Sequence, residues 1–176
     1  MTETPSRPRI STRTVSRASL GFFITLAVIL LVAGITRRAV FPPPPPLTVE
    51  ALAAAETRWQ EAGPKSYSLN IKLGGKRPGR VIINVLDGKA AVMMRDGVSP
   101  ARKETWNAWT VEGMFDTLRQ ELELAEKPER GFGVADRSQV IQRCEFHPRL
   151  GYPVRYQRNV LGTDQEIEWK VESGPE

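Results

Sequence analysis

The stretch SYSLNIKL, residues 66–73, decides the fold because apolar and polar side chains alternate along it. The apolar positions are Tyr67, Leu69, Ile71 and Leu73, and the polar positions between them are Ser68, Asn70 and Lys72. Successive side chains of a β-strand point to opposite faces of a sheet. The pattern therefore predicts a strand with one face in a core and the other face in water.

Two further strands are expected directly after the first. Residues 80–86 and 89–95 are rich in strand-forming residues, and Asp87-Gly88 between them is a strong signal for a two-residue hairpin. The loop GGKRPG, residues 74–79, lacks the G-x-x-x-x-G-K-S/T spacing and the following helix of a phosphate-binding loop. We therefore interpret it as a hairpin loop.

Two helices are expected, one on each side of these three strands. Thr48 has the character of an N-cap for the first helix, which Gly63-Pro64 ends, and Thr110 caps the second, which Pro128 breaks. The apolar face of the first helix is Val49, Leu52, Trp59 and Ala62. The apolar residues of the second recur at helical spacing: Val111, Met114, Phe115, Leu118, Leu122 and Ala125. Both faces are expected to pack on a sheet.

Three more strands close the chain, at residues 139–146, 154–160 and 166–172. In the last of them Ile167, Trp169 and Val171 face one way, and charged residues face the other. The predicted fold class is α+β, with an antiparallel sheet of about six strands in the order helix-βββ-helix-βββ and two helices on one face. Irregular segments are expected around Trp106 and over residues 128–137.

Residues 18–36 form an uncharged run that contains the segment LGFFITLAVILLVAGI. At about 1.5 Å per residue, a helix of this length spans roughly 28 Å, close to the hydrocarbon thickness of a bilayer. A transmembrane signal-anchor helix is predicted here. The alternatives are a cleaved signal peptide and a buried core helix; Arg37-Arg38 at the start of the mature chain is unfavourable for the first of these.

Basic residues on the two sides of the run predict its orientation. Four arginines precede it and two follow it, so the N-terminus is expected in the cytoplasm. The predicted organisation is a cytoplasmic tail (1–17), the transmembrane helix (18–36), a proline-rich stalk (37–47) and an extracytoplasmic α+β domain (48–173). The five prolines of the stalk favour a stiff spacer of roughly 15 Å, with a ligand for SH3-type domains as the alternative.

The net charge of +5 reflects this topology and predicts no nucleic-acid partner. Residues 1–38 carry six arginines and one glutamate, whereas the rest of the chain carries nineteen basic and nineteen acidic residues. A domain without excess positive charge lacks the first requirement for binding nucleic acid. One cysteine, Cys144, and one histidine, His147, exclude an internal disulfide and a His/Cys zinc site. No cofactor or metal is expected, and Cys144 is predicted to be a buried, inert thiol.

The order of several short motifs resembles a family of small bacterial envelope domains of unknown function, many of them secreted or lipid-anchored. The motifs are Trp59 and Tyr67 before the first hairpin, Asp87-Gly88, TVEGMF at 110–115, Gly151-Tyr152-Pro153 and Asp164-x-Glu166. The resemblance covers residues 50–172. It implies the fold and an envelope location, hence the bacterial inner membrane for this chain, and no activity. The chain departs from the family by lacking a cysteine pair in residues 72–79 and by having His147 where an aspartate is favoured.

Three functions are consistent with these features. The first is a non-catalytic binding or assembly module, whose partners are the bilayer, through residues 18–36, and another envelope protein. The second is a carrier that holds an apolar ligand between sheet and helix, in a groove lined by Trp106, Trp109, Phe132 and Tyr152. The third is a hydrolase that uses His147 with Glu145 or Asp164, although no nucleophile is indicated. A large apolar cleft with polar groups would favour the carrier or the enzyme.

The turn over residues 147–153 is the candidate interaction loop. Its residues are His147, Arg149, Gly151, Tyr152 and Pro153. A glycine and two prolines fix the backbone, and an aromatic and an arginine on a rigid loop are favoured interface residues. The alternative is structural: Tyr152 packs back onto the sheet and Gly151 only permits the turn.

Overall fold

The structure, a computed structural model, describes residues 42–175. The predicted cytoplasmic tail, the transmembrane run 18–36 and the first residues of the stalk lie outside this range. Among the described residues, no helix is both long and apolar enough to cross a membrane. One compact unit begins at Pro44 and contains all the helices and strands described below.

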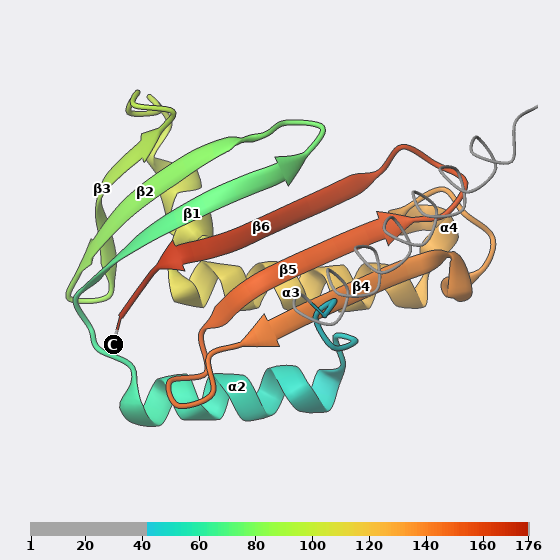
Figure 1. The fold of residues 1–176 in the computed structure, drawn as a ribbon, viewed down its shortest axis with the longest axis horizontal. Helices are drawn as coiled ribbons and strands as arrows, with labels where there is room; N and C mark the ends of the chain where they lie inside the picture. Colours follow the sequence, from blue (N-terminus) through green and yellow to red (C-terminus); the bar gives the residue numbers. More distant parts are fainter. Residues whose placement is uncertain (1–41, 176) are drawn as a thin grey trace, which may run out of the picture. The chain divides into compact units, whose positions relative to one another are not determined.

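A six-stranded antiparallel sheet forms the centre of this unit, which confirms the predicted sheet and the α+β class (Figure 1). The strands lie in the order β3-β2-β1-β6-β5-β4. Their bounds are β1 (Tyr67–Gly75), β2 (Gly79–Leu86), β3 (Lys89–Arg95), β4 (Val140–Phe146), β5 (Pro153–Val160) and β6 (Glu166–Ser173). Each predicted strand was placed to within two residues at either end.

The β2–β3 hairpin turns at the predicted dipeptide. Asp87 and Gly88 both have positive φ, at 50° and 75°. The two-residue turn that matches the twist of a hairpin requires positive φ at both of its central residues. Asp-Gly is among the dipeptides that adopt this turn most readily. The dipeptide therefore sets the register of the pairs next to the turn, and the register shifts at a bulge between Asn84 and Val85.

Two long helices begin at the predicted caps. In α2 (Val49–Ala62) the Thr48 hydroxyl accepts a hydrogen bond from Ala51 N at 3.2 Å, and in α3 (Val111–Glu126) Thr110 does the same for Gly113 N at 3.1 Å. The segments expected to be irregular contain three short helices: η1 (Lys103–Trp109), α4 (Pro128–Gly131) and η2 (Arg137–Gln139).

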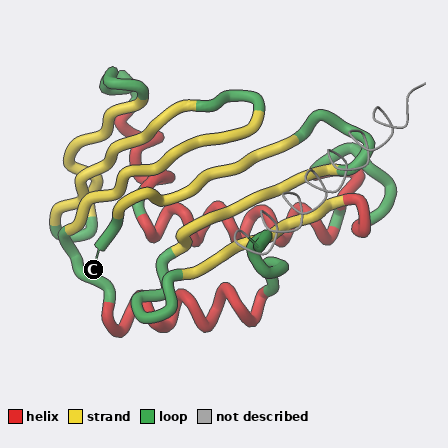
Figure 2. The backbone as a smooth tube through the Cα atoms, viewed as in Figure 1, coloured by secondary structure: helices red, strands yellow, loops and turns green. Residues whose placement is uncertain are grey.

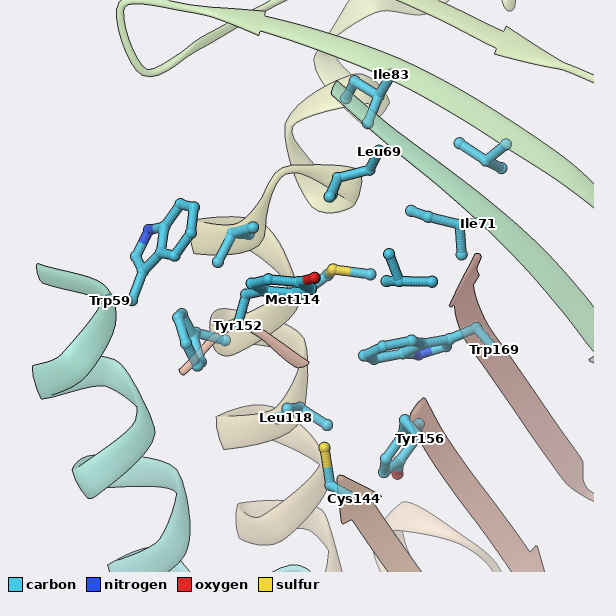
Figure 3. Close-up of a cluster of buried hydrophobic side chains, with 14 of the residues drawn as sticks. Trp59, Leu69, Ile71, Ile83, Met114, Leu118, Cys144, Tyr152, Tyr156 and Trp169 are labelled. Atoms are coloured by element: carbon cyan, nitrogen blue, oxygen red, sulfur yellow. The ribbon is translucent and has the colours of Figure 1, made fainter. Parts of the chain in front are cut away.

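The core lies between the helices and one face of the sheet, called here the inner face (Figures 2 and 3). Most buried side chains of α3 and of the six strands belong to one hydrophobic core together with those of α2, which packs beside α3. A second, smaller cluster contains Ala125, Phe132, Val134, Val140 and Val160. The predicted face of α2 needs a correction, because Val49 is 64% exposed and Ala62 is exposed. Its buried residues are Leu52, Ala55 and Trp59, which a helix places on one side at spacings of three and four.

The end of the proline-rich segment pairs with the edge strand β4. Cys144 N donates to Pro45 O, and Leu47 N donates to Gln142 O, each at 3.0 Å. The Arg143 guanidinium adds a hydrogen bond to Pro44 O at 2.9 Å. Residues 44–47, predicted as part of a free spacer, are therefore held by the folded unit and cover one edge of the sheet.

Candidate functional site

A groove of about 360 Å³ opens on the inner face of the sheet, where β1 and β6 extend past the core. Leu73 of β1 and Trp169 of β6 lie opposite each other on its floor, and Trp109 at the end of η1 also lines it. The next position on β1 is Gly75, which pairs with Ile167 and carries no side chain to cover it. Ile167 consequently remains 38% exposed.

Backbone packing explains why Gly75 is at that position. Its φ is +72°, and an added Cβ would lie 2.9 Å from the Glu166 carbonyl oxygen. A larger residue would therefore be strained and would press against β6. The same glycine that allows the two strands to approach leaves the apolar floor of the groove open.

Of the four aromatic residues predicted to line a groove, Trp109 lines this one, and Tyr152 lines a separate pocket beside His147 and Arg149. Trp109 is half-buried and contributes to the lining, whereas Trp106, Phe132 and Tyr152 are buried. Trp106 uses its indole N–H to bind Pro100 O at 3.2 Å, so it fills the core beneath η1. The prediction missed Trp169 as a lining residue, although its inward position on β6 was correctly predicted.

Positive charge gathers on the β1–β2–β3 side of the groove. Arg95 occupies an inward position on β3 opposite Val81, and its one ion pair within residues 42–175 is with the adjacent Asp96 at 3.9 Å. Arg77, in the β1–β2 turn, has no hydrogen-bond or ion-pair partner in that same range. Lys76 is paired with Asp164. Two guanidinium groups therefore lack a strong carboxylate partner at this rim.

A charged network closes the opposite side of the groove. Nη1 of Arg158, an inward residue of β5, donates to both carboxylate oxygens of Glu121 on α3, at 2.7 and 2.9 Å. The hydroxyl of Tyr156 donates to the same carboxylate at 3.1 Å, and Gln142 Nε2 donates to the Glu121 carbonyl oxygen at 2.7 Å. The Arg158 guanidinium also lies 4.9 Å from the ring centre of Phe132. Burial, and secondarily the Glu121 charge, raises the pKa of Tyr156.

The network was not predicted, but the sequence holds a signal for it. Glu121 follows Leu118 by three residues and precedes Ala125 by four, so it lies on the apolar face of its helix. Arg158 continues the inward alternation of Val154 and Tyr156 along its strand. Each of these charged residues lies on the apolar face of its own element. Two such residues of opposite charge, one on the helix and one on the sheet that it covers, indicate a buried ion pair.

The predicted interaction loop, residues 147–153, packs largely against the interior. Tyr152 is buried; its ring stacks on His147 at 4.8 Å and meets Trp59 edge-on at 6.2 Å. Gly151 has φ +81°, and a Cβ there would lie 2.1 Å from Ala55 O of α2. Pro153 is buried at the start of β5. The exposed part of the loop is therefore Pro148 and Arg149, with His147 half-buried, and its role as a contact surface stays a prediction.

His147 is engaged in holding this turn. Its Nδ1 accepts a hydrogen bond from Leu150 N at 3.1 Å, and its ring stacks on Tyr152. Asp164, one of the two predicted acid/base partners, lies beyond the opposite end of β5, roughly 26 Å away at about 3.3 Å per strand residue. Because of that separation, the predicted pair of His147 and Asp164 is wrong.

Cys144 has the predicted environment. Its side chain is buried on the inner face of β4, among core residues. Burial, together with the nearby Glu145 charge, raises the pKa of the thiol. Among residues 42–175, no three His, Cys, Asp or Glu side chains are grouped closely enough to hold a metal ion.

Comparison with known proteins identifies no relative of this chain. No family model, curated protein or solved structure matches it. The resemblance to bacterial envelope domains therefore stays a prediction.

Proposed function

We propose that this chain is a membrane-anchored, extracytoplasmic binding domain of the bacterial envelope, without catalytic activity, which holds an apolar ligand in the groove between β6 and η1. The observation that carries the proposal is the groove itself. It encloses about 360 Å³ and its exposed lining is mostly apolar. Ligand pockets commonly begin at roughly 300 Å³ and combine an apolar lining with a few polar groups.

Exposed apolar side chains in the groove supply the driving force for binding. Trp109 is half-buried and Ile167 is 38% exposed, on the face of the sheet that otherwise forms the core. Covering apolar surface is worth about 25 cal/mol per Å². A ligand that filled the groove would cover the part of β1 and β6 that extends past the core.

The chemistry around His147 favours binding over hydrolysis. A general base needs a free ring nitrogen close to its substrate and a group that orients it. Here Nδ1 accepts the Leu150 N–H, and Asp164, one of the two partners considered beside Glu145, lies beyond the far end of β5. The groove, which is the apolar cleft on this face, lies at that far end as well.

The sequence before Pro42 supports the location. The uncharged run 18–36 has the length of a membrane span, and more arginines precede it than follow it. The anchor, the stalk that begins at residue 37 and the domain at 48–173 would then place the groove outside the cytoplasm. The resemblance to bacterial envelope domains agrees with this arrangement.

Site-specific photo-crosslinking in the expressing cells tests the proposal. A benzophenone amino acid replaces Ile167 in the groove or, as a matched control, Ile82 on the outer face of β2. Both isoleucines lie on strands and have similar exposure, 38% and 41%. Mass spectrometry of the purified chain then reports the mass of whatever each position captured.

We expect irradiation to add a small molecule of lipid-like mass at position 167 and not at position 82. A protein adduct at position 167 would contradict the proposal and would favour an assembly module that docks another envelope protein. Equal small-molecule labelling at both positions would contradict it as well, because it would show contact with bulk lipid and no selective groove.

A further inference from the structure

We propose that the groove takes a single-chain amphiphile with an acidic head group, held by Arg77 and Arg95; this inference rests on the proposed function. The apolar part would lie over Leu73, Ile167 and Trp169, beside Trp109. The head group, a carboxylate or a phosphate, would lie at the β1–β2–β3 side. Three features of the groove support this assignment.

The first feature is the difference between the two arginine-bearing sides of the groove. Arg95 projects inward from β3 and Arg158 from β5, four strand positions apart in the sheet. At about 4.8 Å per strand this separates them by roughly 19 Å. Glu121 neutralises Arg158 through two hydrogen bonds, whereas the ion pair of Arg95 with Asp96 is 3.9 Å long. An anion is therefore attracted to the Arg95 side.

The second feature is that most acidic residues lining the groove are already paired. Asp164 pairs with Lys76, and Glu168 accepts hydrogen bonds from Arg155 and Gln157 at 3.1 and 2.9 Å. Glu166 is the remaining lining carboxylate, and it faces two arginines: Arg77, which has no partner among residues 42–175, and Arg95, which is weakly paired. Guanidinium groups offer forked donors that match a carboxylate or a phosphate.

The third feature is the size of the groove. Its volume of about 360 Å³ is near the lower end of the range for ligand pockets. The apolar residues lie on one side of the charged rim, so the lining changes from cationic to apolar along the groove. One acyl chain with a compact anionic head fits this pattern and this volume.

Photo-labelling of the full chain, in nanodiscs of the zwitterionic lipid phosphatidylcholine, tests the inference. The probes are palmitic acid that carries a diazirine on its chain and the methyl ester of the same molecule. Peptide mapping measures labelling of the groove peptides around Leu73, Trp109 and Ile167. Unlabelled palmitate and lysophosphatidic acid serve as competitors that distinguish a carboxylate from a phosphate head group.

The variants separate the head group from the groove. Arg77→Gln with Arg95→Gln removes the two cations, and Lys72→Gln with Arg80→Gln removes the same charge from β1 and β2 on the opposite face. We expect the acid to label the groove about tenfold more than the ester, as for one charge-assisted contact. The first variant should abolish this preference and the second should leave it unchanged.

Each remaining outcome decides one part of the argument. Equal groove labelling by acid and ester, or failure of both anionic competitors, would overturn the acidic head group while leaving an apolar groove, and so the proposed function, in place. Absence of groove labelling with either probe would overturn both. An equal loss of preference in the two double variants would show that net charge acts without a site and would overturn the assignment to Arg77 and Arg95.

Discussion

At the scale of single residues, the buried charge of Glu121 links α3 to β5 through its ion pair with Arg158. Its carboxylate accepts hydrogen bonds from Arg158 and Tyr156. The side chains of Glu121 and Arg158 are each about 10% exposed. Removing one member of a buried ion pair leaves the other charge without compensation and typically costs about 3–5 kcal/mol. Replacing both members by apolar residues is often neutral.

We therefore expect Glu121→Ala to lower the free energy of unfolding by about 3 kcal/mol or more, measured by urea denaturation. Glu123→Ala, two residues along the same helix and exposed, is the matched control and should change stability by less than about 0.5 kcal/mol. The double variant Glu121→Leu with Arg158→Met should recover most of the loss. Equal stability of the Glu121 and Glu123 variants would mean that water screens the pair.

Cys144 gives a second prediction at this scale. Because burial raises the pKa of its thiol, the reactive thiolate is disfavoured in the folded domain at neutral pH. We expect a membrane-impermeant maleimide to label the native chain slowly and the urea-unfolded chain rapidly. Rapid labelling of the native chain would show that β4 opens readily at this position.

At the scale of secondary-structure elements, the sequence predicts what is local. Alternation and strand-forming composition predicted the six strands, and Thr48, Thr110 and Asp87-Gly88 predicted the two helix starts and one hairpin, because each signal acts between residues close in the chain. The groove was harder to predict, since an open face depends on which residues lie above it. Trp106 and Trp109 are three residues apart, yet one is buried and the other lines the groove.

The pairing of the proline segment with β4 was missed for the same reason. Arg143 and Pro44 are 99 residues apart in sequence, so no local pattern joins them. Prolines have no N–H to donate, and this segment bonds β4 through the carbonyls of Pro44 and Pro45 and the N–H of Leu47. A proline-rich strand at a sheet edge also offers few donors for further strand pairing.

This arrangement predicts that Leu47 stabilises the domain. Its side chain is 5% exposed and belongs to the main core, so Leu47→Ala should cost about 2–4 kcal/mol in the free energy of unfolding. Leu86→Ala, at an exposed position of β2, is the control and should have little effect. If thermal unfolding of the two variants coincided, residues 44–47 would be a free spacer, as the sequence first indicated.

At the scale of the whole molecule, the envelope location in the proposed function depends on the side of the membrane that the domain occupies. The groove would meet amphiphiles of the envelope if the domain lies outside the cytoplasm. The charges that predict this orientation are the four arginines before the run and the two after it. They lie outside the described residues, so the orientation needs its own experiment.

Alkaline phosphatase fused after Glu176 provides that experiment, because the enzyme needs disulfides that form outside the cytoplasm. We expect an active reporter that sediments with the membrane, and an inactive one when the fusion is made after Arg17, before the apolar run. Activity in the soluble envelope fraction would identify residues 18–36 as a cleaved signal peptide and leave the groove extracytoplasmic. An inactive reporter after Glu176 with an active one after Arg17 would reverse the orientation. That result would remove the envelope from the proposed function, while the groove's preference for an acidic head group could still be measured.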